Sequence, residues 1–372
     1  MDLQAQDWVK DIWWHGVKSV QGGQAVETAL RKYQVARPDQ IIAVGKAASA
    51  MLAGAQETFG PDIPSLVVTK YDHTLALPGP VRVIEAAHPV PDENTLAAGV
   101  EVLKTVQQLP ENAHLLMLVS GGASSLVEFP EPGLTLQALQ SENARLLAEG
   151  LDIHTMNVRR KEMSRIKGGK LLENFEGELV TTLAISDVQG DSLSVVGSGI
   201  GQAPKNYRFS FDPYIVASNE IARAACAKHA SKLRLNVVTN LETLYADVYE
   251  LAAEIGPLLR DAPPGVHIWG GEPTIVLPPD PGQGGRNQAL ALALAEQISG
   301  VFGLDILVAG TDGTDGPTDA AGALVTGATW TEEAKRYQRL ADSGHFLEEC
   351  EALFKSGPTS TNVMDLLIAL KS

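Results

Sequence analysis

The stretch HLLMLVSGGASSL, residues 114–126, decides the fold class of this chain. Its apolar run, Leu115–Val119, is too short to cross a membrane and is typical of a strand buried on both faces. Two glycines follow at once, and small residues that can open a helix come next. A buried strand, a glycine turn and a helix in this order are typical of a parallel sheet covered by helices.

The same succession recurs on both sides of this stretch, after an opening helical segment. Buried strands are predicted over residues 41–45, 65–69, 81–86, 115–120 and 179–186, and helices over 46–58, 92–109 and 135–149. Asp92 stands where an N-cap belongs. The alternation predicts an α/β protein with a mostly parallel sheet.

The second half keeps the alternation with different turns. Helices are predicted over 213–230, 240–259 and 285–298, and strands over 266–269 and 304–309. The change in turns lies near residues 231–240, so we expect an N-terminal domain over 1–235 and a smaller C-terminal α/β domain over 236–372.

Length and composition narrow the class of protein. At about 150 residues per domain, 372 residues indicate two or three domains, and 44% hydrophobic with 20% charged residues is a globular composition. The net charge of −16 disfavours nucleic acid and anionic membranes as partners. Two distant cysteines offer neither a disulfide framework nor a zinc cluster, and the first residues show no export signal. We therefore expect a cytoplasmic protein.

The oligomeric state stays open at this point. Trp8, Trp13 and Trp14 could pack on the chain's own domain or on a partner, so a homodimer is one expectation.

Four glycine-rich turns follow predicted strands, at residues 44–47, 120–125, 270–272 and 310–316. Ligands of open α/β sheets bind beyond the carboxyl ends of the strands, where glycine lets backbone N–H groups approach anionic oxygens. Ordinary turn chemistry explains any one of these turns, whereas four together predict an anion-binding cleft. The chain has no GxxxxGK[ST] loop and no GxGxxG fingerprint, which disfavours a nicotinamide enzyme.

Basic groups accompany these turns. Residues 120–125 combine two glycines with three serines and predict a phosphate cradle, and Lys46 follows a strand directly. Residues 159–170 hold six basic residues and one acidic residue, which would focus a small anion unless they form a solvated helix face. Arg286 stands in the first turn of a helix, where a cation is unfavourable unless an anion binds there.

Carboxylates also follow the strands. Asp187 and Asp191 come after the strand over 179–186, and Asp312, Asp315 and Asp319 recur among glycines. Carboxylates there suit Mg²⁺ shared with phosphates, or a base that takes a hydroxyl proton, although Asx turns explain each one singly and explain Asp319 better. His88 is followed by two prolines, Pro89 and Pro91, and is interpreted as part of a rigid turn.

Nine stretches, taken in order, resemble a known family. They are VGKAA (44–48), HPVPDE (88–93), SGGASSL (120–126), GLDIHTMNVRRKEMSRIKGGKL (150–171), SDVQGD (186–191), GGEPT (270–274), GQGGRNQALALALA (282–295), AGTDGTDGPTDAAGA (309–323) and GPTSTNVMDL (357–366). Together they resemble the glycerate 2-kinase family, whose C-terminal half is called the MOFRL domain.

The resemblance implies a Rossmann-like N-terminal domain, a smaller MOFRL domain and an active site in the cleft between them. It implies transfer of the γ-phosphoryl of ATP to the 2-hydroxyl of D-glycerate, with Mg²⁺. Lys46 and Arg286 would stabilise the phosphoryl, and Asp187 would be the base or, with Asp191, a metal ligand. The implied substrate-binding and ATP-binding residues are Gly45, Ser120, Gly121, Gly122, Ser124, Arg159, Lys167, Glu272, Asn287, Asp312 and Asp315.

The loop after Asp187 departs from the family. Members commonly read DVPGDDP and then ASGPT, whereas this chain has Gln189, Ser192 and Leu193, and then SGIG at 198–201. The acceptor could therefore be another small hydroxy acid or a sugar acid. Two further alternatives are an oxidoreductase of the hydroxypyruvate reductase type, against which the missing fingerprint counts, and a sensor that has lost the chemistry.

Overall fold

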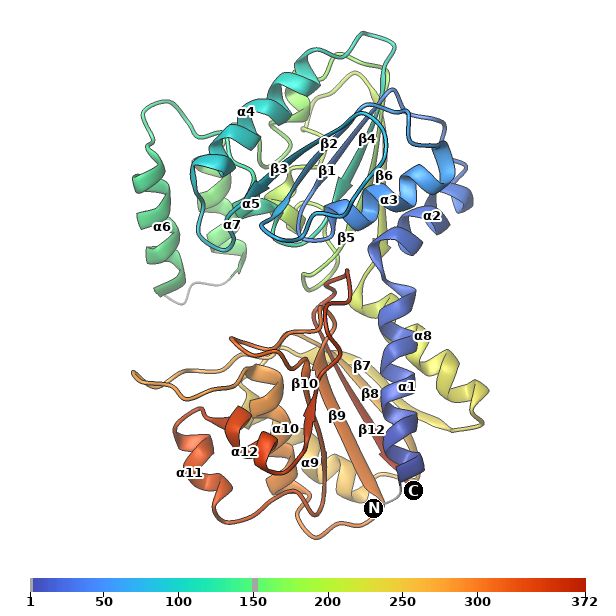
Figure 1. Cartoon of the computed structure of the whole chain (residues 1–372), viewed down its shortest axis with the longest axis vertical. Coiled ribbons are helices and arrows are strands. Elements are labelled where there is room, and N and C mark those ends of the chain that lie inside the picture. The colour runs from blue at the N-terminus through green and yellow to red at the C-terminus, as the bar shows by residue number, and fades with distance from the viewer. Residues whose placement is uncertain (1–2, 149–152) are drawn as a thin grey trace. The chain divides into compact units, whose positions relative to one another are not determined.

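The computed structural model describes residues 3–148 and 153–372, which form two compact units (Figure 1). The N-terminal unit comprises Gln21–Ser218 and Ser360–Asn362. The C-terminal unit comprises Met1–Val20, Asn219–Thr359 and Val363–Ser372. Each unit contains its own six-stranded sheet, and the prediction of an α/β protein is confirmed.

The N-terminal unit is built on a parallel sheet of order β3-β2-β1-β4-β5-β6. Its elements are α2 (Gly22–Lys32), β1 (Gln40–Val44), α3 (Ala48–Phe59), β2 (Ser65–Lys70), β3 (Val81–Ala86), α4 (Glu93–Gln107), β4 (His114–Val119), α5 (Ala123–Leu126), α6 (Leu136–Ala148), α7 (Ile153–Glu162), η1 (Leu172–Asn174), β5 (Leu179–Ile185), η2 (Val196–Gly199) and β6 (Ser210–Ala217). The predicted strands in this half are all present.

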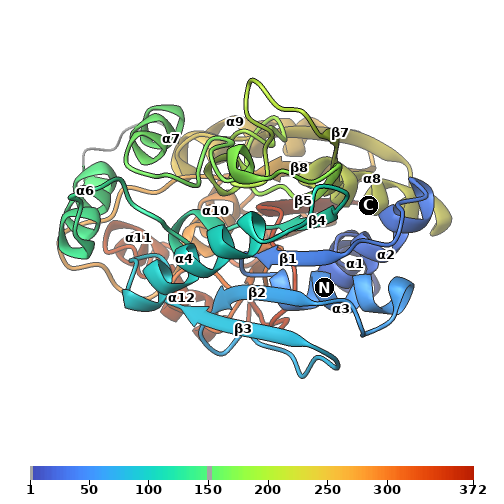
Figure 2. The same cartoon turned by 90° about the horizontal axis from the view of Figure 1, so that it is seen from above.

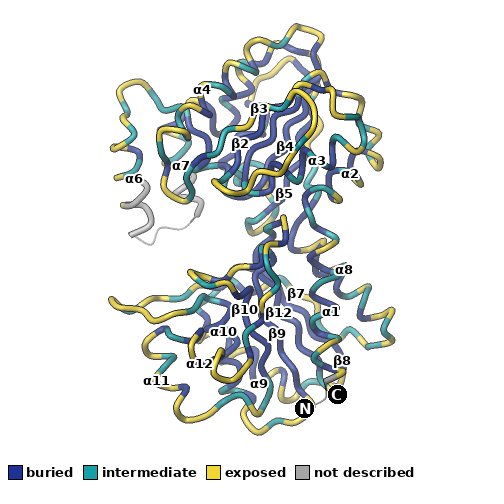
Figure 3. Tube along the Cα trace, in the orientation of Figure 1, coloured by how far each residue is buried: buried dark blue, intermediate teal, exposed yellow. Residues whose placement is uncertain are grey.

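Strand β4 occupies the centre of that sheet and every one of its residues is buried, as the dark tube of Figure 3 shows. Leu115, Met117 and Val119 contribute to a core cluster with the apolar side of α4, while α2 and α3 pack on the other face of the sheet. Asp92 caps α4 as predicted, because its carboxylate accepts the Thr95 N–H at 3.0 Å.

The C-terminal unit contains a mixed sheet of order β11-β10-β9-β12-β8-β7. Its elements are α1 (Leu3–Ser19), α8 (Asn219–Lys232), β7 (Val237–Leu244), α9 (Val248–Asp261), β8 (Gly265–Gly271), α10 (Arg286–Gln297), β9 (Leu304–Gly310), β10 (Gly322–Thr326), α11 (Ala334–Arg339), α12 (Ser343–Glu349), β11 (Leu353–Phe354) and β12 (Asp365–Lys371). Helices α9 and α10 share one core with the sheet, and α1 and α8 contact its strands as well (Figure 2). Strand β12 runs antiparallel between β8 and β9.

Two predicted helices begin as strands, and the predictions for those residues were wrong. Residues 210–217 form β6 before α8 begins at Asn219, and residues 237–244 form β7 before α9 begins at Val248. Both are edge strands in which every residue but the last is at least partly exposed, so a buried-and-exposed alternation is not visible in the sequence. Pro213 is tolerated because an edge strand does not need every N–H.

The compact units do not follow the expected ranges 1–235 and 236–372. Helix α1 packs on α8 and β12, so this helix joins the C-terminal unit. Trp13 is fully buried there, edge-on to Phe354 with ring centroids 5.0 Å apart. Among the helices that the structure describes, none is long and apolar enough to span a membrane.

Candidate functional site

The turns after β1 and β4 are tied to each other at the carboxyl edge of the N-terminal sheet. The Lys46 N–H donates to the Gly121 carbonyl at 2.9 Å, and the Ala47 N–H donates to Ser120 Oγ at 3.1 Å. Strands β1, β4 and β5 are parallel neighbours, so the residues that follow them gather at one edge. Two amides that the sequence suggested for anion binding are thus used to join the turns.

Close approach requires glycine at two of these positions. A β-carbon at Gly45, whose φ is +127°, would lie 2.2 Å from Ser120 Oγ. A β-carbon at Gly121 would lie 2.0 Å from Oδ2 of Asp187. The carboxylate after β5 therefore rests directly on the turn after β4, and the predicted residues Gly45, Ser120, Gly121 and Asp187 come together.

His88 and Lys46 flank the third glycine of this edge. A β-carbon at Gly122 would lie 3.1 Å from both His88 Cδ2 and Lys46 Cγ. Burial, and then the positive charge of Lys46, lowers the pKa of His88 to about 4, with smaller contributions from Lys70 and Arg160. The imidazole is therefore neutral near pH 7 and lies among cations.

Sequence reasoning missed His88 as a member of this cluster. The prolines beside it suggested a rigid turn, and that interpretation left its side chain without a function. The available signal was its position two residues after β3, which ends at Ala86. The carboxyl ends of all strands in a parallel sheet lie at the same edge, so a residue that follows any of them is a candidate for the site.

The basic segment 159–170 divides into groups with different partners. Lys167 is buried and forms an ion pair with Glu128. Arg159 is exposed and pairs with Glu162 at 3.1 Å. Arg160 is half-buried; burial lowers its pKa, the carboxylate of Glu128 opposes that shift, and its charge reaches His88. Arg160 is thus the member of the segment that acts electrostatically on the Lys46 and His88 cluster.

The other predicted residues of this unit lie beside the same turns. Ser124 is half-buried in the short helix α5, which follows the turn after β4. Asp191 is half-buried in the loop after β5, at a φ of +50°.

Arg286 is held by two carboxylates of the C-terminal unit. As the first residue of α10, it donates from Nε to Asp365 Oδ2 at 2.7 Å and from one terminal nitrogen to Glu272 Oε1 at 2.7 Å. Asp365 begins β12 and lies opposite Gly271 and Gly310, so it joins the ends of β8 and β9. These carboxylates raise the pKa of Arg286 in spite of its burial. The predicted conflict of a cation at a helix start is offset by acidic side chains.

The other predicted groups of this unit shape the same edge. Asp315 accepts the N–H groups of Asn287 and Gln288 at 3.0 and 2.8 Å, which caps α10. Burial, with a smaller contribution from Asp365, raises the pKa of Asp315 to about 7. Asp312 accepts the Thr314 N–H at 3.0 Å, which is a turn contact. Asn287 is buried and hydrogen-bonds Asp365.

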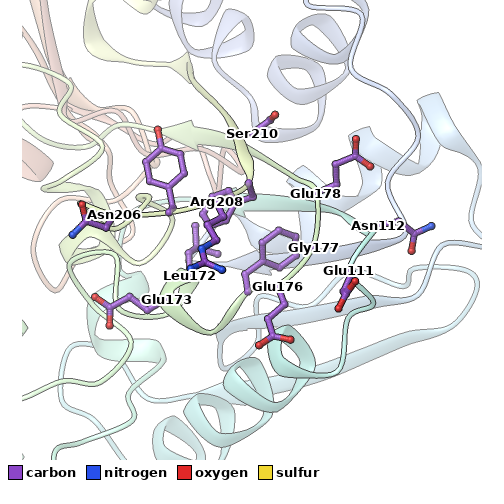
Figure 4. Close-up of a pocket in the computed structure, with 13 residues that line it drawn as sticks. Glu111, Asn112, Leu172, Glu173, Glu176, Gly177, Glu178, Asn206, Arg208 and Ser210 are labelled. Atoms are coloured by element: carbon purple, nitrogen blue, oxygen red, sulfur yellow. The ribbon is translucent and has the colours of Figure 1, made fainter.

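A hollow of about 970 Å³ lies at the opposite edge of the N-terminal sheet (Figure 4). Its lining residues precede β4, β5 and β6 and include Glu111, Glu173, Glu176, Glu178 and Arg208. Four carboxylates and one guanidinium do not suit a phosphorylated ligand. The glycine turns are therefore the better candidate site.

These features define a two-unit α/β protein whose parallel sheet gathers glycine turns and basic side chains at its carboxyl edge. Two family models match the chain: "Domain of unknown function (DUF4147)" over residues 8–212 and "MOFRL family" over residues 265–365. The chain belongs to the glycerate 2-kinase family, as its motifs predicted.

Relatives match almost the whole chain. D-glycerate 2-kinase of Thermotoga maritima is 36% identical over 399 residues and covers 95% of both chains. A protein of Agrobacterium vitis with the provisional name hydroxypyruvate reductase is 33% identical, covering 88% of this chain and 97% of its own. The crystal structure of glycerate kinase from Thermotoga maritima matches with a TM-score of 0.89 and 34% identity over 98% of this chain and 99% of that one.

Proposed function

We propose that this protein transfers the γ-phosphoryl group of ATP to the 2-hydroxyl of D-glycerate. The observation that carries the proposal is the cluster of Lys46, His88 and Asp187 around Gly121 and Gly122. It combines a cation, a neutral imidazole and a carboxylate at the edge where α/β sheets bind ligands. The glycerate kinase names of the relatives support the same reaction.

Lys46 is assigned the largest electrostatic role. Phosphoryl transfer depends mainly on positioning and on stabilising charge that spreads over the phosphoryl oxygens. The backbone N–H groups of Lys46 and Ala47 already bond to the turn after β4, so the ammonium supplies the stabilisation at this turn. Gly45 and Ser120 fix the backbone from which the Lys46 side chain extends, and Gly122 lies beside the Cγ atom of that side chain. Ser124 is assigned a hydroxyl hydrogen bond to the same phosphate.

Asp187 is assigned to the acceptor hydroxyl or to Mg²⁺. Its carboxylate lies against Gly121, where it could take the proton of the 2-hydroxyl as phosphoryl transfer proceeds. Carboxylates are also the hard oxygen ligands that suit Mg²⁺, and Asp191 follows in the same loop. Bound there, Mg²⁺ would neutralise phosphate charge.

Arg160 is our choice for the carboxylate of D-glycerate. Of the predicted cations, Arg159 is exposed and paired with Glu162, and Lys167 is buried with Glu128. Arg160 is half-buried and close enough to His88 to lower its pKa. A guanidinium can bind a carboxylate through two parallel hydrogen bonds.

For the C-terminal unit we propose that Arg286 stabilises negative charge on the reacting phosphate. Of the two carboxylates that pair with Arg286, the side chain of Asp365 is buried, whereas that of Glu272 is 46% exposed. A phosphate oxygen can therefore replace Glu272 while Asp365 keeps the guanidinium in place. Asn287, Asp312 and Asp315 maintain the loop and helix start around it.

The two possible roles of Asp187 are distinguished by measuring kcat at a series of Mg²⁺ concentrations. If Asp187 is the base, Asp187→Asn lowers kcat by about a hundredfold or more and leaves the Mg²⁺ dependence unchanged. If it is a metal ligand, the variant needs more Mg²⁺ for half-maximal rate, and Asp191→Asn shifts the same dependence. Full turnover in Asp187→Asn would contradict both roles.

The same preparation tests the oxidoreductase alternative that the Agrobacterium vitis relative raises. The proposal predicts no oxidation of NADH or NADPH with hydroxypyruvate. Turnover in that assay without ADP release from ATP and D-glycerate would overturn the kinase assignment.

A further inference from the structure

Helices α1 and α8 pack closely in the C-terminal unit, far along the sequence from each other (Figure 1). A β-carbon at Gly16 would lie 2.4 Å from Cys226 Sγ and 3.1 Å from the Ala222 carbonyl oxygen. Glycine at this position therefore lets the two helices approach. The approach brings the polar side of α1 next to His229 of α8.

Three polar side chains meet where the helices approach. The His229 Nε2 atom lies 2.6 Å from Asp11 Oδ2, and His15 Nδ1 lies 3.4 Å from Asp11 Oδ1. The two imidazole rings are stacked, with centroids 3.3 Å apart and planes 9° from parallel. One ligand atom from each residue lies within 4.8 Å of the others.

We propose that Asp11, His15 and His229 form a binding site for one divalent transition-metal ion, with Zn²⁺ as the best match. Asp11 and His15 are four residues apart on one helix, so they present ligands from the same face. Two imidazole nitrogens and one carboxylate oxygen are a ligand set that zinc accepts, with water in the fourth position.

Exposure of the site permits both entry of the ion and adjustment of the rings. The side chains of Asp11 and His15 are 47% and 42% exposed, and that of His229 is 13% exposed. Imidazole lone pairs lie in the ring planes, and the two planes are nearly parallel, so His15 has to turn out of the stack before both nitrogens can bind one ion. That rotation releases His15 Nδ1 from the Asp11 carbonyl oxygen, which lies 2.9 Å away. The exposure of His15 leaves room for that rotation.

The ligand chemistry separates this site from the Mg²⁺ of phosphoryl transfer. Mg²⁺ prefers oxygen ligands and keeps several waters, whereas imidazole nitrogen favours zinc, copper and nickel. An ion bound by Asp11, His15 and His229 joins α1 to α8 within one unit. We therefore expect it to stabilise the docking of the N-terminal helix.

The test uses the full chain without an affinity tag, treated with a chelator and then dialysed. Isothermal titration with ZnCl₂ should show one ion per chain, and the melting temperature should rise with zinc concentration. Co²⁺ gives a second readout, because its visible absorption reports nitrogen ligands and a low coordination number. His229→Ala and His15→Gln should each weaken zinc binding by at least about tenfold.

His345→Ala is the matched control. The Nδ1 atom of His345 lies 2.6 Å from Asp342 Oδ1 and the His345 side chain is half-exposed. Among the described residues, this pair is not part of a group of three potential metal ligands. The control should bind zinc as the wild type does. Absence of zinc binding in the wild type overturns the proposal, and so does equal binding by the His229→Ala, His15→Gln and wild-type proteins.

Discussion

The carboxylate of Asp187 fills the space that a side chain at Gly121 would need, with Oδ2 2.0 Å from the position of a β-carbon there. The turn after β4 and the end of β5 are thus fitted to each other. A methyl group at position 121 has to displace the carboxylate, although the backbone there does not need a positive φ.

Gly121→Ala should therefore lower kcat/KM by about a hundredfold, because small displacements of a reacting group are costly. Steady-state kinetics with D-glycerate and ATP measure the effect. Gly133→Ala adds a methyl group where no atom lies within 4 Å, at a backbone φ of +89°. It should therefore cost some stability, because alanine is strained there, but retain most of kcat/KM, because it leaves Asp187 in place. Equal activity of the two variants would show that the position of Asp187 is unimportant.

Lys46→Met should lower kcat by about a hundredfold or more and leave the protein folded. The same change removes one of the charges that lower the pKa of His88, so that pKa should rise from about 4. Titration of the His88 ring by NMR measures the shift and shows that the site is still folded. An unchanged pKa would mean that Lys46 is not beside His88 in solution.

Arg159 and Arg160 form a matched pair of neighbouring arginines. Arg160→Ala should raise the KM for D-glycerate at least tenfold, because a charged hydrogen bond to the carboxylate is lost. Arg159→Ala removes an exposed pair with Glu162 and should change KM little. The reverse order of effects would return the role to Arg159, as the sequence resemblance implied.

The raised pKa of Asp315 should make the stability of the protein depend on pH. Burial raises the pKa of its carboxyl from 3.8 to about 7, so between these values the folded protein holds a proton that the unfolded chain has released. The contribution of this carboxyl to the free energy of unfolding should therefore fall as the pH rises from about 4 to about 7. Asp315→Asn removes this dependence, so denaturant unfolding should show the variant gaining on the wild type over that range. A constant difference between the two proteins would contradict the raised pKa.

The parallel sheet of the N-terminal unit could be predicted because its central strands are buried on both faces and end in glycine turns. The edge strands β6 and β7 could not, since every residue but the last of each strand is at least partly exposed and their hydrophobic pattern is ambiguous. Strand β12 was also missed: nothing local to 365–371 says that it enters the sheet between β8 and β9.

The candidate site shows the same limit. Lys46, Ser120 and Asp187 were predicted as site residues because each follows a strand, and they stay a prediction. The separation of Arg160 from Arg159 depends on which side of one helix is covered, and the role of Asp315 as a cap for α10 depends on a contact 28 residues away in sequence. Tertiary packing decides both, and the sequence carries no local sign of it.

The most direct test of the proposed reaction is to incubate the protein with ATP, Mg²⁺ and D-glycerate, measure ADP release, and locate the new phosphate by NMR. A glycerate 2-kinase should release ADP only when D-glycerate is present and should form a product phosphorylated at the 2-hydroxyl. Absence of ADP release with D-glycerate, from protein that binds ATP, would contradict the proposed reaction.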